Sequence, residues 1–383
     1  MTATMLTAPE ETHSSAIGVE QPMAGTSVLL TAERRADQLS SLLCRRGAQT
    51  LLAPVLTLIP CSSDPDLIRA TRELLEDPPD VLVVTTAVGF RGWIEAADYV
   101  GLTASLLTML ASVRILTRGP KALGAVLSSG LTPDWSAPSE TSEEVVEQML
   151  SEGVSGLRVA IQHHAAGPDG LDAALVAAGA EVVGLVTYRR GPAQDPEAVR
   201  ASAHQVSAGL VDAVCFTSAM AVHAWFEVVD ALGLAEQITT RVTSGQTVVA
   251  AVGPVCAAPL RARGMTPLVP ERSRLGALAR TVVEHYETVP SIPTAAGPLR
   301  LRRTTAVLED AVMPLSPTSL DLLRLLAQRP GAVVPRSDIQ ASLPGRDSSG
   351  HAVDVAVSRL REGLGSPGLV QTVVKRGYRL NVG

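Results

Sequence analysis

The chain of 383 residues is 46% hydrophobic and has a formal net charge of −6, so it is long enough for two or three globular domains. It has no run of roughly 18 to 20 apolar residues, which a membrane helix needs, and its four cysteines show no C-x-x-C spacing, which fits free thiols in a reducing cytoplasm. Residues 299–383 hold twelve Lys and Arg against seven Asp and Glu, giving +5 against −11 for the rest, so only the C-terminal region is expected to meet a polyanion.

The first 24 residues are polar and acidic. They show neither the basic start nor the apolar run of a signal peptide. We expect residues 1–24 to form a flexible tail, and the protein to be cytoplasmic.

From Ser27 onward, short apolar runs alternate with helical patterns. The runs SVLLT, TLLAPVL, VLVVTT and VRILT have the length of strands, and GLRVAIQ, VVGLVTY, AVCFTS and TVVAAVG repeat them later. Helical patterns lie between them, such as RADQLSSLLCRRG, which ends at a glycine. This alternation predicts an α/β fold with parallel sheets that are covered by helices on both faces.

Two stretches of the chain are near copies of each other. DVLVVTTAVGFRGWIE (80–95) and DAVCFTSAMAVHAWFE (212–227) lie 132 residues apart and share a tryptophan at the same position. The similarity extends on both sides, so residues 27–150 and 157–286 are interpreted as two copies of one unit. The TT and TS pairs follow a strand and precede a helix, where parallel sheets bind ligands. They cap their helices, bind an anion, or do both.

The order of TTAVG, LVTYRRGP, FTSAM and VGPVCAAPLRARGMTP resembles the uroporphyrinogen-III synthase family over residues 25–288. The resemblance implies two flavodoxin-like lobes that are joined by a two-stranded linker. It also implies an enzyme without a cofactor, whose substrate hydroxymethylbilane carries eight carboxylates and is cyclised with inversion of ring D. The implied segments are PVLTLIP (54–60) and LVTYRRGP (185–192) for the linker, 26–55 with 192–287 for lobe one, and 61–184 for lobe two.

The same resemblance places the proton donor of this reaction at Tyr188, in the returning strand of the linker. The alternative is that Tyr188 only packs its ring there. Hydroxyls, backbone N–H groups and cations at the strand ends are expected to hold the substrate carboxylates. This expected set is Thr85, Thr86, Arg118, Lys121, Thr217, Ser218 and Gly253.

Two other polar pairs lie near the expected site. Arg189 either adds positive charge beside Tyr188 or is a solvated cation, and the second interpretation is favoured for both Arg189 and Arg190. The adjacent His163 and His164 follow a strand, so their side chains point in different directions and no metal site is expected.

The C-terminal region predicts a small separate domain. SIPTAAGP has the composition of a linker, which we place at residues 289–298. Three helical patterns follow, and the third, over residues 351–364, puts Val353, Val357, Leu360 and Leu364 on one side. Two short strands around Lys375 complete the pattern of a winged helix.

This pattern resembles the DNA-binding domain of OmpR/PhoB-type response regulators over residues 299–383. The resemblance implies that the third helix enters the major groove of double-stranded DNA and that the hairpin reaches a minor groove. Base contacts are expected from His351, Val355 and Ser358. Phosphate contacts are expected from Arg359, Arg361, Lys375, Arg376 and Arg379.

The match departs from the family at three positions. Ala356, Glu362 and Gly363 stand where polar or basic residues are usual. We therefore expect modest affinity for DNA from one monomer, and binding as a dimer or with a partner regulator. The usual receiver domain is replaced by the synthase-like region, so the sequence gives no support to phosphorelay control.

Two functions fit these features. In the first, the protein is a transcription regulator whose synthase-like module senses a small molecule, such as a tetrapyrrole precursor, or docks a partner; this layout resembles actinobacterial regulators of nitrate and nitrite assimilation. In the second, the protein is a working uroporphyrinogen-III synthase that also binds DNA. The DNA-binding pattern is the sharper of the two matches, so the first hypothesis is favoured.

Overall fold

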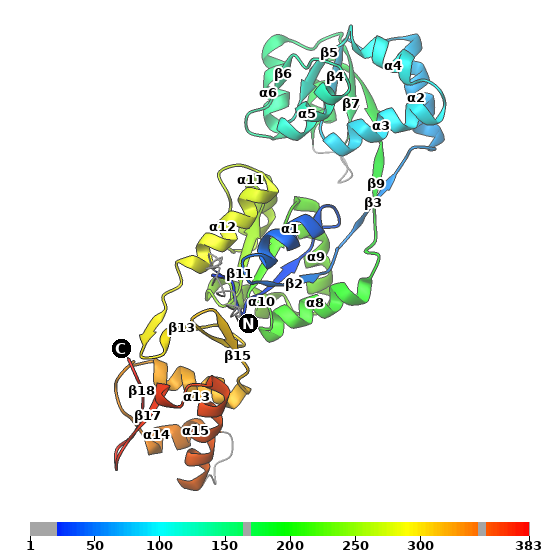
Figure 1. The fold of residues 1–383 in the computed structure, drawn as a ribbon. Coiled ribbons are helices and arrows are strands. Elements are labelled where there is room, and N and C mark those ends of the chain that lie inside the picture. Colours follow the sequence, from blue (N-terminus) through cyan, green and yellow to red (C-terminus); the bar gives the residue numbers. More distant parts are fainter. Residues whose placement is uncertain (1–20, 164–169, 344–349, 383) are drawn as a thin grey trace, which may run out of the picture. The chain divides into compact units, whose positions relative to one another are not determined.

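The computed structural model describes residues 21–163, 170–343 and 350–382. Within this part the chain forms two parallel α/β sheets, here called lobe one and lobe two, and a smaller C-terminal domain (Figure 1). The predicted fold class, two α/β lobes and a winged-helix domain, is confirmed. Residues 1–20 of the expected N-terminal tail lie outside the described residues.

Lobe one is built on a four-stranded sheet in the order β11-β10-β1-β2. A parallel bridge between Ala250 and Leu268 lies beside β11. The strands are β1 (Ser27–Leu30), β2 (Gln49–Leu52), β10 (Ala213–Phe216) and β11 (Val248–Ala251). The helices are α1 (Ala36–Cys44), α8 (Pro196–Ala208), α9 (Ala219–Ala231), α10 (Ala235–Thr243), α11 (Pro254–Ala262) and α12 (Leu275–Glu287).

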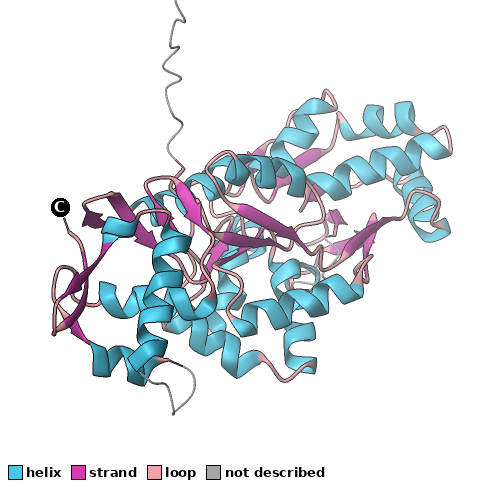
Figure 2. Ribbon diagram, turned by 60° about the horizontal axis from the view of Figure 1, so that its bottom comes forward, coloured by secondary structure: helices cyan, strands magenta, loops and turns pink. Residues whose placement is uncertain are grey.

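Lobe two is built on a five-stranded parallel sheet in the order β6-β5-β4-β7-β8. Its strands are β4 (Val81–Val84), β5 (Arg114–Thr117), β6 (Trp135–Ser136), β7 (Arg158–Gln162) and β8 (Glu181–Leu185). Its helices are α2 (Pro65–Glu76), α3 (Ala87–Tyr99), α4 (Thr103–Leu110), α5 (Pro120–Ser128), α6 (Ser142–Glu152) and α7 (Leu171–Ala177). Helices flank the strands of the lobes in Figure 2.

Two antiparallel strands carry the chain from one lobe to the other. They are β3 (Thr57–Pro60) and β9 (Tyr188–Gly191), which pair from Thr57 opposite Gly191 to Pro60 opposite Tyr188. Because of these crossings, the two sequence copies exchange halves. Lobe one takes β1 and β2 from the first copy and β10 and β11 from the second, and lobe two takes the complementary strands. Equivalent strands then have the same order in both sheets. Counted along the chain, the order in lobe one is 2-1-3-4, which agrees with the flavodoxin-like order.

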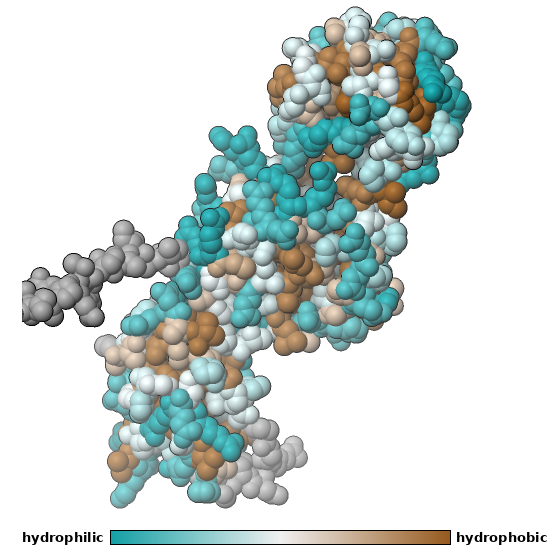
Figure 3. Space-filling model, turned by 45° about the vertical axis from the view of Figure 1, so that its right-hand side comes forward, coloured by the Kyte–Doolittle hydropathy of each residue, from teal (hydrophilic) through white to brown (hydrophobic). Residues whose placement is uncertain are grey.

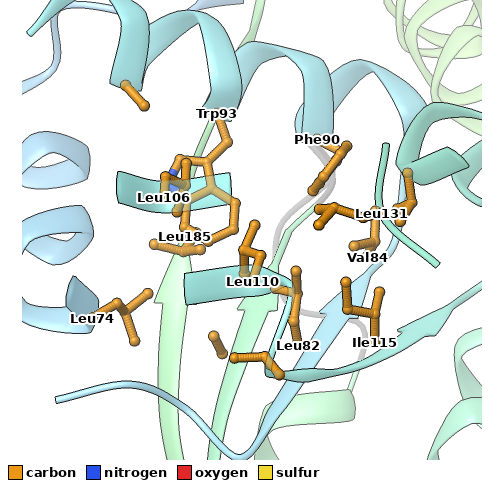
Figure 4. Packing of buried hydrophobic residues seen from close by; sticks show 14 of the residues in the cluster. Leu74, Leu82, Val84, Phe90, Trp93, Leu106, Leu110, Ile115, Leu131 and Leu185 are labelled. Atoms are coloured by element: carbon orange, nitrogen blue, oxygen red, sulfur yellow. The ribbon is translucent and has the colours of Figure 1, made fainter. Parts of the chain in front are cut away.

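The strand β4 shows why its sheet is covered on both faces. Successive side chains of a strand point to opposite faces, and all four residues of VLVV are buried. Leu82 and Val84 belong to one apolar cluster with Phe90 and Trp93 of α3, whose rings point from the helix into the cluster in Figure 4. Val81 and Val83 belong to a second apolar cluster on the other side.

The matched tryptophans have matched hydrogen bonds. Trp93 Nε1 donates to Thr71 Oγ1 of α2 over 2.9 Å, and Trp225 Nε1 donates to Ser202 Oγ of α8 over 3.1 Å. Both indoles are fully buried. The repeated tryptophan therefore joins two helices of each lobe through a hydroxyl that the preceding helix supplies.

The C-terminal domain begins with a four-stranded antiparallel sheet and continues with three helices and a three-stranded sheet in the order β16-β18-β17. Val353, Val357, Leu360 and Leu364 of the third helix are all buried, as predicted. The first sheet has β12 (Ile292–Thr294), β13 (Gly297–Leu301), β14 (Ala306–Leu308) and β15 (Ala311–Met313). The remaining elements are α13 (Pro317–Ala327), β16 (Val334–Pro335), α14 (Arg336–Ser342), α15 (Gly350–Leu364), η1 (Pro367–Leu369), β17 (Val370–Val373) and β18 (Gly377–Leu380).

The expected linker at residues 289–298 differs from the structure. This segment contains β12 and the start of β13, which form a hairpin with Pro293 opposite Pro298. The Thr294 hydroxyl donates to the Gly297 carbonyl and closes the turn. Proline is tolerated in β12 because it is an edge strand. A composition typical of a linker is therefore used here for a tight hairpin.

The expected tail also ends earlier than predicted. Met23 and Ala24 are buried, and the Met23 N–H donates to the Arg46 carbonyl over 3.0 Å. The apolar side chain of Met23 gains enough from burial to order the end of this segment.

The surface hydropathy and the lengths of the helices bear on whether a helix could span a membrane. Hydrophilic and hydrophobic residues are mixed on the face drawn in Figure 3. Among the described residues, every helix is too short or too polar to cross a membrane.

The hydrogen bond between Trp93 and Thr71 gives a test of the packing in lobe two. Thr71→Val keeps the shape but leaves a buried indole N–H without its acceptor, so it should lower the free energy of unfolding by about 1–3 kcal/mol. Urea unfolding followed by circular dichroism measures the change. Thr71→Ser keeps the hydroxyl and should cost less; an equal loss in both variants would contradict this role of the hydroxyl.

Candidate functional site

Hydroxyl and amide groups gather in lobe two where β4 and β7 end. The two strands pair in parallel with Val84 opposite Gln162, so Thr85 and Gln162 lie at the same edge of the sheet. The buried Thr85 hydroxyl donates a 2.6 Å hydrogen bond to the Gln162 carbonyl. Thr85 thus stabilises the sheet edge, and its contact with a substrate carboxylate stays a prediction.

Thr86 is the N-cap of α3 and also contacts the candidate proton donor. Its Oγ1 accepts a 3.1 Å hydrogen bond from the Gly89 N–H, which is the capping bond. The same Oγ1 lies 3.3 Å from the hydroxyl of Tyr188, and either group is able to donate. The structure therefore brings together two of the residues that the sequence selected.

Gln162 lies at the centre of this cluster and was missed in the sequence. Its Oε1 accepts the Thr86 N–H over 3.1 Å, and its Nε2 lies 3.4 Å from the hydroxyls of both Thr86 and Thr187. The residue is completely buried. A Cβ at Gly89 would overlap the Gln162 amide, so glycine in TTAVG leaves room for it. The available signal was a polar residue at the end of the apolar run RVAIQ.

Tyr188 is held by both its backbone and its ring. It begins β9 opposite Pro60, and only 4% of its surface is exposed. The buried ring fits the packing role, and the hydroxyl at its end contacts the hydroxyl of Thr86. Both alternatives from the sequence are compatible with this placement.

Two predicted cations follow β5 in lobe two. The Arg118 N–H donates to the Val84 carbonyl over 3.0 Å, which puts Arg118 next to the end of β4. Its guanidinium is half-buried and donates to the Ser142 hydroxyl over 3.3 Å. Lys121 lies in the first turn of α5 and is exposed. Arg118 is thus positioned by α6, whereas Lys121 faces solvent.

The predicted residues of lobe one lie at the matching edge of its sheet. Thr217 and Ser218 follow β10, and Gly253 comes shortly after β11. The strands β10 and β11 pair in parallel with Phe216 opposite Ala251, so both ends lie at the same edge of the sheet. Ser218 Oγ caps α9 by accepting the Ala221 N–H over 3.1 Å. Gly253 is the N-cap of α11, and a Cβ there would collide with Ser273.

The two arginines beside Tyr188 are paired rather than simply solvated. Arg189 forms a 2.8 Å ion pair with Asp64, and Arg190 pairs with Glu227 through both guanidinium nitrogens. Surface pairs of this kind contribute little stability, but they orient the side chains of β9. His163 Nε2 lies 3.2 Å from Asp172, and His164 lies outside the described residues.

The predicted base-contacting face of α15 is on the surface of the winged-helix domain. His351, Ser358 and Arg359 are exposed and Val355 is half-buried. The Ser358 hydroxyl lies 3.5 Å from Glu362 on the next turn. These residues share one side of the helix because the apolar residues occupy the other side.

The hairpin supplies the remaining predicted contacts, and its cations differ in their surroundings. Lys375 and Arg376 are exposed in the turn between β17 and β18, where Lys375 has a left-handed φ of 60°. Arg379 is also exposed but donates to Gln371 over 2.8 and 2.9 Å. Arg361 donates to the Val370 carbonyl and the Thr372 hydroxyl, so it ties α15 to β17. Phosphate contacts by all four stay predictions.

A polar network that the sequence did not predict holds α15 in place. Asp354 of α15 accepts hydrogen bonds from the Tyr378 hydroxyl and from Arg336 of α14. These bonds lower the pKa of Asp354 below its usual value. Burial, followed by the bond to Asp354, raises the pKa of Tyr378. The network links α14, α15 and the hairpin into one unit.

The unusual glycine of α15 has a packing reason. A Cβ on Gly363 would lie 2.7 Å from Leu315 Cδ2, so a basic side chain would force the segment before α13 away. Glycine here permits close approach of the two segments.

The contact between Gly89 and Gln162 predicts strong coupling between two substitutions. Gly89→Ala should destabilise the protein because the new methyl group displaces a buried amide. In a Gln162→Ala background the same change should cost clearly less, since the obstructing amide is gone. A double-mutant cycle by urea unfolding measures the coupling, which for residues in contact is about 0.5–3 kcal/mol. Additive effects would contradict the contact.

The chain matches two protein-family models. The family model "Uroporphyrinogen-III synthase HemD" matches residues 37–280, and the model "Transcriptional regulatory protein, C terminal" matches residues 310–380. A solved mutant of uroporphyrinogen III synthase from the extremely thermophilic bacterium Thermus thermophilus is 30% identical, with 68% of this chain and 98% of that chain covered at a TM-score of 0.57.

Two further relatives cover different parts of the chain. The uncharacterized protein YjjA of Bacillus subtilis (strain 168) is 28% identical over 269 residues, which are 69% of this chain and 97% of the relative. The DNA-binding domain of Klebsiella pneumoniae RstA, solved with the RstA box, is 28% identical over 24% of this chain and 96% of that chain, with a TM-score of 0.21. The chain belongs to the uroporphyrinogen-III synthase family, and it carries a C-terminal winged-helix DNA-binding domain of the OmpR/PhoB type.

Proposed function

We propose that the protein is a transcription regulator that binds double-stranded DNA and uses its synthase-like module to sense a small molecule or to dock a partner. One observation carries this proposal: the polar face of α15 and the cationic hairpin turn are exposed on a domain of a DNA-binding family. Arg359, Lys375 and Arg376 supply the positive charge there. The remainder of the chain is acidic, which favours DNA contact through this domain alone.

The roles of the individual residues follow from their positions. His351, Val355 and Ser358 are placed on α15 to meet base edges in the major groove. Arg359, Lys375 and Arg376 are placed to neutralise phosphates on either side. Arg361 and the network around Asp354 hold the helix against the hairpin, so the two reading elements move as one body. Binding as a dimer would supply the affinity that Glu362 removes from each monomer.

The sensed molecule is proposed to be a polycarboxylate of the tetrapyrrole precursor class. Hydroxyls and helix N-termini lie at the carboxyl edge of each sheet, and Arg118 and Lys121 add positive charge in lobe two. Such groups bind carboxylates through N–H and O–H donors. This ligand class is supported by the family to which the module belongs.

DNA binding is tested by removing two exposed cations. Arg359→Ala combined with Lys375→Ala should weaken binding to a fluorescein-labelled duplex of random sequence, because two phosphate contacts are lost. The slope of log K against log salt should fall in magnitude by about two. Fluorescence anisotropy at several salt concentrations measures both quantities.

The matched control is a double variant that loses two positive charges outside the winged-helix domain. Arg69 and Arg200 are exposed arginines of α2 and α8 in surface ion pairs, so Arg69→Ala with Arg200→Ala should leave DNA binding nearly unchanged. Equal loss of affinity in both double variants would show a general charge effect, and unchanged binding in the first would refute the contact assignment.

A second function is favoured by the contact between Tyr188 and Thr86. Ring closure of hydroxymethylbilane begins with loss of a hydroxyl, which needs a proton donor. The Tyr188 hydroxyl is a candidate for this proton, and the Thr86 hydroxyl 3.3 Å away would stabilise the phenolate that remains. The protein would then be a uroporphyrinogen-III synthase that also binds DNA.

Turnover separates the two functions. The full chain is mixed with hydroxymethylbilane, and the type III isomer is scored against the type I isomer that forms spontaneously. If the protein is a synthase, Tyr188→Phe should lower the rate of type III formation by about 10²- to 10⁴-fold. Tyr99→Phe is the control, because Tyr99 is 69% exposed. Formation of type I alone would exclude the synthase function and leave the module as a binding module.

A further inference from the structure

Segments far apart in the sequence meet in one part of the molecule. The chain divides into two compact units, and one of them combines residues 279–383 with residues 38–50 and the segment that ends at Ser27. The DNA-binding domain therefore belongs to the same unit as residues 21–27, which precede β1. The contacts between them centre on one arginine, Arg302, after the end of β13.

Arg302 is buried although it carries a charge. Only 5% of its surface is exposed. Its Nη2 donates to the carbonyl of Pro22, and its guanidinium lies 5.3 Å from the ring centre of Tyr286, near the end of α12. Removing a guanidinium from water is unfavourable unless such partners replace the water. The contact is thus a specific fit rather than a chance approach of two surfaces.

Gly25 shows how closely the two segments fit. It has a left-handed φ of 70°, and a Cβ there would lie 2.6 Å from Thr305 Cγ2 and 3.1 Å from Val307 Cγ2. A side chain would therefore be strained by the backbone and would collide with the turn and with β14. Glycine avoids both penalties.

The contacts continue on each side of Arg302. Toward the DNA-binding helices, Arg324 of α13 donates to the Arg302 carbonyl over 2.9 Å, and α13 and α15 contribute to the same apolar core. On the other side, the Met23 N–H bonds to the Arg46 carbonyl, and the Thr26 carbonyl accepts the Gln49 N–H over 2.8 Å. An uninterrupted series of contacts therefore joins the start of β2 to the support of the recognition helix.

We propose that Pro22, Gly25, Tyr286, Arg302 and Thr305 form a joint, here called the Arg302 joint, which holds the DNA-binding domain rigidly on the segment before β1. The domain is then not tethered by a free linker. If the protein is the regulator proposed above, on which this step rests, the joint is also the element through which a ligand bound to the module changes the affinity for DNA. A rigid connection is required for this, because a domain on a flexible tether does not respond to its neighbour's conformation.

The rigidity is tested on the full chain by ¹⁵N relaxation. In the wild type, amides of residues 306–343 and 350–380 should share the rotational correlation time of residues 38–50, which belong to the same compact unit. Arg302→Met keeps the apolar stem but removes the guanidinium, and the shared correlation time should be lost, with the domain tumbling faster. The control is Arg300→Met: Arg300 lies in β13, two residues before Arg302, but pairs with Asp310 in the turn between β14 and β15, and its loss should leave the correlation time unchanged.

A second variant approaches the joint from the opposite side. Gly25→Ala introduces the colliding Cβ without altering Arg302, and it should produce the same faster tumbling. Well-dispersed amide spectra establish that the lobes and the domain of each variant remain folded. Faster tumbling of the domain already in the wild type, or no change in both folded variants, would overturn the joint.

The regulatory consequence has its own readout. Affinity for the labelled duplex is measured with and without uroporphyrinogen III, the probe for the tetrapyrrole class. The expected result is a ligand-dependent change in the wild type and in Arg300→Met that is lost in Arg302→Met. If the probe changes DNA affinity equally in Arg302→Met, transmission through the joint is refuted. If it changes nothing in the wild type while the relaxation result holds, the joint stands as a structural element and this sensory proposal fails.

Discussion

The pairing of β3 with β9 is the constraint on which both lobes depend. These two strands are the crossings between the lobes, and they decide which strands enter which sheet. Their register also sets the position of Tyr188, since Pro60 lies opposite it and β9 begins there. The hydroxyl of Tyr188 reaches Thr86 only because this register brings the start of β9 to the end of β4. A shift by one residue would turn the ring to the other face of the strand.

The polar groups of lobe two are organised by a buried amide. Gln162 binds the backbone of Thr86 while Thr86 caps α3, so the first turn of that helix is tied to β7. A network of this kind is rigid when all its members are paired. The equivalent helix of lobe one, α9, is capped by Ser218. The copies thus keep the same cap but differ in what supports it.

Charge is divided between the parts of the protein in a way that suits DNA binding. The acidic portion would be repelled by phosphates, whereas the exposed cations of the winged-helix domain would be attracted. The Arg302 joint would add a geometric constraint to this division. Binding would then orient the whole unit that contains the joint, and not a loosely attached domain.

Much of the architecture was predictable because it depends on periodicity. The apolar runs gave the strands, the copied stretches gave equivalent turns, and the helical pattern of α15 gave its buried face. Gln162 was missed because one polar residue at a strand end looks like the start of a loop. The linker prediction at residues 289–298 was wrong because proline and glycine also build hairpins, and composition does not distinguish the two. Arg302 was missed because its burial involves a contact with Pro22, 280 residues away in the sequence. Met23 was missed because a single apolar residue in a polar segment does not show that the segment packs beside Arg46.

The exchange of halves has a consequence for the order in which the protein is made. Lobe two spans β4 to β8, so all its strands have been synthesised once the ribosome passes Leu185. Lobe one begins first but has to wait for β10 and β11, because β1 pairs with β10 across a large loop. Its first strand, β1, remains unpaired on that side during this time, which exposes an apolar edge to other chains. We therefore expect nascent chains in which lobe two is folded while the strands of lobe one on either side of it are still unpaired. Chaperones are expected to bind the segment around β1 and β2 during this time.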